Sequence, residues 1–116
     1  MNVTDTAAAF ASTGGTTTAG LAAIAAQDGD AVITVTDAAT VAQFNTIDAA
    51  TSSNVVLTGG VTDTAAAFAS TGGTTTAGLT AIAAQDGDAV ITVSDAAKVA
   101  QFNTIDAATS SNVVLT

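Results

Sequence analysis

The chain has 116 residues, of which 48% are apolar, and its ten acidic residues against one basic residue give a formal net charge of −9. Proteins bind nucleic acids and anionic lipid surfaces through clusters of Lys and Arg, so this composition argues against both partners. No apolar run approaches the roughly 20 residues of a membrane-spanning helix, which predicts no membrane insertion. The sequence also lacks His, the most frequent general acid–base, and Cys, a strong nucleophile, so we expect no enzyme.

The sequence repeats itself with an offset of 58 residues. Val3–Thr58 and Val61–Thr116 are identical at 53 of 56 positions. We call these stretches unit 1 (3–58) and unit 2 (61–116); Gly59–Gly60 joins them, and residues 1–2 are interpreted as an added start. A period of this size is typical of stacked-repeat architectures. The near-identity indicates a recent duplication or an excerpt from a longer array. The three differences are Ala22/Thr80, Thr36/Ser94 and Thr40/Lys98.

The first half of unit 1 predicts two helices. An Ala-rich run follows Asp5, which predicts a short capped helix over residues 4–11 that Gly14–Gly15 ends. In residues 17–27 the larger apolar side chains fall on one helical face. The sequence therefore predicts a second helix here, with Gly29 as its left-handed C-cap.

The second half of unit 1 predicts two strands around a helix. Residues 31–36 and 54–58 are short runs rich in β-branched side chains, as in strands. Between them, residues 37–51 carry apolar side chains on one helical face, and Asp37 is placed as the N-cap. Unit 2 predicts the same elements, with strands over residues 89–94 and 112–116.

Strands that alternate with helices favour a parallel sheet with right-handed crossovers. We therefore predict an α/β tandem-repeat solenoid, with two strand–helix coils per unit and Gly59–Gly60 as a seam. The alternative is that Gly59–Gly60 forms a hairpin turn and residues 61–64 a strand, which would give two mixed α+β beads. The four Phe residues are expected to anchor the core: Phe10, Phe44, Phe68 and Phe102.

Two carboxylates flank a Gly in each unit, within the sequence Gln-Asp-Gly-Asp. Closely spaced carboxylates beside a sharp turn can bind Ca²⁺. The chain lacks the Glu that ends an EF-hand loop and the repeated Gly-Gly-x-Gly-x-Asp of calcium β-rolls, so a polar turn between helix and strand is the favoured interpretation. Calcium is the one cofactor left open, at Asp28, Asp30, Asp86 and Asp88.

The remaining aspartates are most simply structural. Asp5, Asp37 and their copies Asp63 and Asp95 are interpreted as N-caps of the helices that follow them, each contributing about 1 kcal/mol. A ladder of these carboxylates that binds ions weakly is the alternative. Asp48, like its copy at 106, is expected to be solvated.

The sequence "ITVTDAATVAQFNTIDAAT…VVLTGGVTDTAAAF" resembles the Ala/Thr/Asp-rich tandem repeats of very large bacterial cell-surface proteins. These include adhesin-like giants and the giant surface proteins of marine cyanobacteria that are linked to non-flagellar swimming. The resemblance implies an extracellular structural array and supplies no catalytic residues. Calcium dependence is common in such proteins.

These observations predict a structural segment of a large bacterial cell-surface protein that acts as an elongated, self-stacking spacer or scaffold. Its expected partner is a second copy, bound head-to-tail through the repeat seam, because an exposed sheet edge invites pairing. The alternative function is a calcium-binding adhesin-type module stabilised at the two Gln-Asp-Gly-Asp turns.

Overall fold

The computed structural model describes residues 2–116, and each unit contributes three strands and three helices to it. In unit 1 the order is β1 (Asn2–Asp5), α1 (Ala7–Phe10), α2 (Ala19–Gln27), β2 (Val32–Val35), α3 (Val41–Ala49) and β3 (Val55–Leu57). In unit 2 it is β4 (Val61–Asp63), α4 (Ala65–Phe68), α5 (Ala77–Gln85), β5 (Ile91–Val93), α6 (Val99–Ala108) and β6 (Val113–Leu115).

Each unit folds around its own three-stranded parallel sheet. The strand orders are β1-β2-β3 and β4-β5-β6, with all neighbouring strands parallel. Side chains alternate along β2, where Ile33 and Val35 are fully buried and Thr34 is half-buried. The predicted mixed α/β class with parallel strands is confirmed, although the strands form two sheets and not one.

The predicted helix over residues 4–11 is wrong in its first half. Val3 and Thr4 pair with β2 as a strand, and only the four residues of α1 are helical. The β-branched pair gains a parallel ladder that a local reading of the Ala-rich run does not reveal. The unit order is therefore β–α–α–β–α–β, with one strand more than predicted.

The caps of the longer helices also differ from the prediction. Helix α3 begins at Val41, not after Asp37, because Thr40 forms a capping box with Gln43. Helix α2 ends at Gln27, and the backbone N–H of its C-cap residue, Asp28, donates to the Ile24 carbonyl. Gly29 is not in the left-handed region, since Gly15, Gly60 and Gly73 are the glycines with positive φ among residues 2–116.

Gly59–Gly60 does not form a hairpin, because β3 and β4 belong to different sheets. A Cβ on Gly59 would lie 2.2 Å from the carbonyl carbon of Asp37. Gly60 has a φ of +75°, and a Cβ there would lie 2.3 Å from the carbonyl oxygen of Val90. The link therefore requires glycine at both positions, since the chain passes against the backbone of both units.

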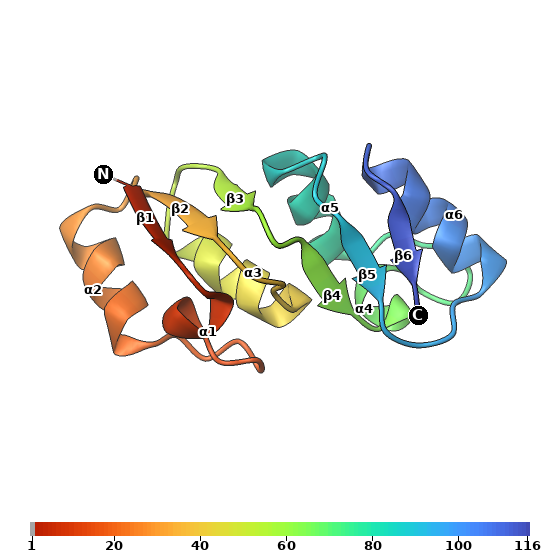
Figure 1. The fold of residues 1–116 in the computed structure, drawn as a ribbon, viewed down its shortest axis with the longest axis horizontal. Coiled ribbons are helices and arrows are strands. Elements are labelled where there is room, and N and C mark those ends of the chain that lie inside the picture. The colour runs from red at the N-terminus through yellow and green to blue at the C-terminus, as the bar shows by residue number, and fades with distance from the viewer. Residues whose placement is uncertain (1) are drawn as a thin grey trace.

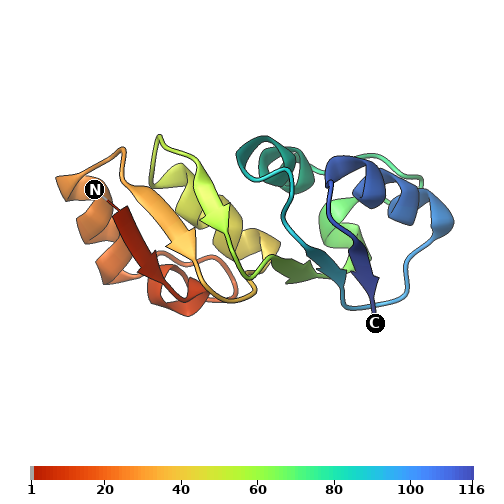
Figure 2. The same ribbon diagram turned by 45° about the horizontal axis from the view of Figure 1, so that its top comes forward.

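The molecule is elongated, measuring 44 × 23 × 20 Å, with the two units side by side along its long axis (Figure 1). The turned view in Figure 2 shows the same arrangement, with the labelled termini in different units. One hydrophobic cluster runs through both units and includes Phe10, Phe44 and Phe68. Phe102 departs from the prediction, because it is only half-buried.

Candidate functional site

The two units contact each other through two helices and a strand, and we call this contact the junction. Helix α3 of unit 1 packs against α5 of unit 2. The two helices approach closely at Gly78, where a Cβ would lie 2.5 Å from Cγ1 of Val41. Val41 is left only 8% exposed. A helix–helix contact this close requires a residue without a side chain at position 78.

Strand β4 forms the second part of the junction. The Thr62 N–H donates to the Ala39 carbonyl at 2.9 Å, and the Ala39 N–H donates to the Gly60 carbonyl at 3.1 Å. Between them Val61 is fully buried. Within residues 2–116, Ala39 and Val61 form the one β-bridge between the units, a parallel one, so β4 is hydrogen-bonded on both of its edges.

Aspartates cap helices across the fold, not the helices that follow them. The Val41 N–H at the start of α3 donates to Oδ2 of Asp63 at 3.0 Å, across the junction. The Ala7 N–H of α1 donates to Oδ1 of Asp37 at 2.7 Å, and Asp95 accepts equivalently in unit 2. Asp5 does not cap a helix in this way, since the bond its carboxylate accepts comes from Thr6, the N-cap residue of α1. For Asp37, Asp63 and Asp95 the predicted capping role is correct in kind but wrong in partner. Each carboxylate satisfies an unpaired helix N–H and faces the positive end of that helix's dipole.

Side chains from the end of α5 cover the outer edge of β3. The Val55 N–H donates to Oε1 of Gln85 at 3.1 Å, and the Leu57 N–H donates to Oδ2 of Asp86 at 2.8 Å. Two N–H groups that would otherwise be left unpaired on a sheet edge are thereby satisfied.

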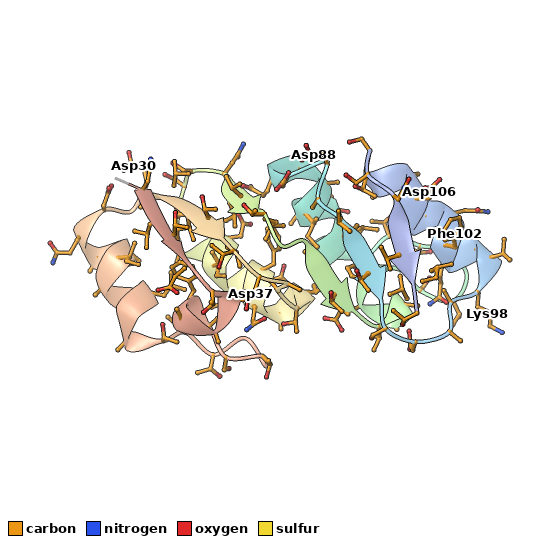
Figure 3. All side chains as sticks on the ribbon, viewed as in Figure 1. Asp30, Asp37, Asp88, Lys98, Phe102 and Asp106 are labelled. Atoms are coloured by element: carbon orange, nitrogen blue, oxygen red, sulfur yellow. The ribbon has the colours of Figure 1, made fainter. Side chains whose placement is uncertain are left out.

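The predicted calcium ligands lie in equivalent turns on the same edge of the two units, as Asp30 and Asp88 show in Figure 3. A hydrogen bond between Asp28 and Asp30 lowers the pKa of Asp28 and raises the pKa of Asp30. In unit 2, burial at the junction raises the pKa of Asp86, and a hydrogen bond with Asp88 adds to the effect.

Each turn brings two carboxylates together. Across residues 2–116 no group of three or more acidic side chains is placed to hold a metal ion. Asp86 already accepts the Leu57 N–H, which gives it a structural role at the junction. Calcium binding at the four residues stays a prediction.

At the far end of unit 2, the residues equivalent to the unit 1 side of the junction have no second unit packed against them. Val99 and Leu115, which correspond to the buried Val41 and Leu57, are 76% and 57% exposed, against 8% and 3% in unit 1. They line a hollow of about 440 Å³, which we call the end groove. Its remaining lining comes from Asp95–Lys98, Phe102 and Thr116. Figure 3 shows Lys98 and Phe102 together at this end.

Sequence reasoning missed the residues that build the junction. Gly78 lies inside a helix, where Gly is unfavourable relative to Ala, and that conflict was the available signal of a close approach. Gln43 is 3% exposed and satisfies two backbone groups, the Thr40 N–H at 2.9 Å and the Ala11 carbonyl at 3.0 Å. Gln43 lies within unit 1, not at the junction, and its position three residues after Thr40 was the signal of a capping box.

No protein-family model, curated protein or solved structure matches this chain. Among residues 2–116, no helix has both the length and the apolar character needed to cross a membrane.

Proposed function

We propose that this chain is a non-catalytic structural repeat, a spacer segment of a large bacterial cell-surface protein in which consecutive units stack into an elongated α/β solenoid. Its task is mechanical: each junction repeats the same contacts, so the array extends with a fixed geometry. The extracellular, surface location is proposed on the resemblance stated above and on the acidic composition.

The junction is the observation that carries this proposal. It is not a flexible link between separate beads, because it buries Val61 fully, packs α3 against α5 and satisfies helix and strand N–H groups across it. The hydrophobic cluster is continuous through it. A third unit placed after residue 116 would meet the same residue types that unit 2 presents to unit 1, because the two units are nearly identical.

The experiment is small-angle scattering on proteins with two, four and six units, joined by the same Gly-Gly link. A stack predicts that the maximum dimension grows in proportion to unit number, by about half of the present 44 Å for each added unit. Units joined flexibly would instead grow roughly with the square root of their number. That slower growth would contradict the proposal.

The matched control replaces the glycine at the Gly78 position with Ala at every junction. It should convert proportional growth into the slower growth, because a Cβ there collides with the facing Val. Rods that persist unchanged in this variant would show that the junction does not set the shape.

A further inference from the structure

The end groove at α6 and β6 is an incomplete copy of the junction, and the missing part is present at the other end of the same chain. In the junction, the lining residues of the groove correspond to Asp37–Val41, Phe44, Leu57 and Thr58. Of these, Ala39, Val41, Phe44 and Leu57 are buried there, where β4 and α5 pack against unit 1. Strand β1 carries the same Val-Thr-Asp sequence as β4. Val3 is only half-buried, and Thr4 and Asp5 are exposed.

We propose that the end groove binds the N-terminal face of a second copy of this chain, formed by β1 and α2, through the contacts that β4 and α5 make inside the molecule. This inference rests on the proposed function and deepens it by naming the docking segment and its groove. Val3 of the second copy would take the place of Val61. The Thr4 N–H would donate to the Ala97 carbonyl, as the Thr62 N–H does to Ala39.

Charge complementarity supports the same occupant. Asp5 of the second copy takes the place of Asp63, so its carboxylate accepts the Val99 N–H at the start of α6. Lys98, the only basic residue of the chain, lies beside that N–H at the rim of the groove. The junction has Thr40 at this position. The contact between two copies therefore gains an ion pair that the internal junction lacks.

Close packing supports it independently. Gly20 corresponds to Gly78, and within one chain only atoms of Thr18 and Ala9 lie within 4 Å of a Cβ placed on it. In the docked pair Gly20 would face Val99 as Gly78 faces Val41. An added methyl group at position 20 is thus tolerated in the single chain and collides only in the pair.

The test is sedimentation velocity of the purified chain over a concentration series at fixed moderate salt. The wild-type chain should associate into species that continue beyond the dimer, because a head-to-tail contact does not close. Gly20→Ala should fold with an unchanged or higher melting temperature and associate about ten- to a hundredfold more weakly.

The matched control is Ala22→Thr on the same helix. Position 22 is exposed, its equivalent Thr80 remains exposed beside the junction, and Thr is the natural residue there. This variant should associate like the wild type. Asp5→Asn should weaken association about two- to fivefold, and much less when Lys98→Thr is also present.

Three outcomes would overturn the inference: a wild-type chain that stays monomeric throughout the series, equal association of Gly20→Ala and Ala22→Thr, or a species that stops at the dimer. The last would indicate closed pairing of two β6 edges. None of them touches the proposed function, which the covalently joined units test separately.

Discussion

At the scale of single residues, the junction depends on the lack of a Cβ at Gly78. Gly78 leaves room for Cγ1 of Val41, and Val in a helix is held to one preferred rotamer, so it cannot turn away cheaply. The equivalent residue of unit 1, Gly20, has no helix of another unit packed against it within the chain. The two positions therefore separate the effect of the junction from the effect of glycine itself.

Gly78→Ala is expected to lower the free energy of unfolding by about 1–3 kcal/mol, because the added methyl group overpacks the junction. The higher helix propensity of Ala offsets up to about 1 kcal/mol of this loss. Gly20→Ala should have only the gain in helix propensity. Urea denaturation of both variants, at a concentration where the chain is monomeric, measures the difference. Equal stabilisation of the two would mean that α3 and α5 do not approach as described.

The raised pKa of Asp86 predicts a pH dependence of stability. A carboxyl group whose pKa is higher in the folded state than its ordinary 3.8 binds its proton more tightly when folded. The resulting stabilisation is present below pH 3.8 and is lost as the pH rises through the raised value. The raised pKa of Asp30 acts in the same direction and the lowered pKa of Asp28 opposes it.

Asp86→Asn should therefore reduce the fall in unfolding free energy between about pH 4 and neutrality, since the amide keeps an acceptor for the Leu57 N–H but no longer titrates. Asp106→Asn removes the same charge from an exposed position and is the control. Urea titrations across this range measure both. An equal effect of the two substitutions would assign the pH dependence to net charge alone.

At the scale of elements, strands and helices are tied together by side chains that reach across the fold. Asp63 ends β4 and caps α3, Asp37 follows β2 and caps α1, and Gln85 ends α5 and covers β3. Each capped helix or strand edge is therefore stabilised by an element distant in sequence. The N–H groups at the ends and edges of these elements are therefore paired only when the elements pack together.

Asp63→Ala is expected to cost about 1 kcal/mol more than Asp5→Ala, because Asp63 caps α3 across the junction whereas the Asp5 carboxylate, among residues 2–116, accepts from its neighbour Thr6 alone. Chemical denaturation of the two variants provides the comparison, and Asp63→Asn should recover part of the loss. Equal losses at the two positions would indicate that the bond to Val41 contributes no stability.

The sequence supports local predictions better than distant ones. Residues 31–36 and 54–58 are rich enough in β-branched side chains to predict β2 and β3, and α2 lies within the predicted range 17–27. Strand β1 was not predicted, and a strand at its copy in residues 61–64 was given only as the alternative, which β4 bears out. The four residues of β1 precede an Ala run and are stabilised by pairing with residues about 30 positions away. Local propensity does not contain that pairing.

The same limit applies to the candidate site. Adjacent carboxylates drew attention to Asp28, Asp30, Asp86 and Asp88, whereas the junction centres on Val41 and its partners in unit 2. A valine in an amphipathic helix carries no sign of which helix it faces. The repeat itself was visible, but the residues that join its copies follow only from the packing.

At the scale of the whole molecule, the continuous core predicts that both units unfold together. In scanning calorimetry the calorimetric and van't Hoff enthalpies should agree for the wild-type chain. In Gly78→Ala the units should unfold more independently, so the van't Hoff enthalpy should fall below the calorimetric enthalpy. Two separate transitions in the wild type would contradict the rigid junction.

Calcium offers a last test at this scale. If the four aspartates of the two turns bind Ca²⁺, the melting temperature should rise in millimolar calcium relative to chelator, because a ligand of the folded state stabilises it. The double variant Asp30→Asn/Asp88→Asn should abolish the rise. An equal melting temperature in both conditions would contradict calcium binding at the turns. Their known contribution would then be the bond from the Leu57 N–H to Asp86.

Each unit brings both halves of the junction, the valine on one face and the glycine and aspartate on the other. For the proposed array, recombination between near-identical gene copies would add or remove whole units, and every new boundary would again join matched halves. Length is then free to vary between generations while the cross-section of the protein stays constant. Selection can act on reach alone, without first repairing an interface.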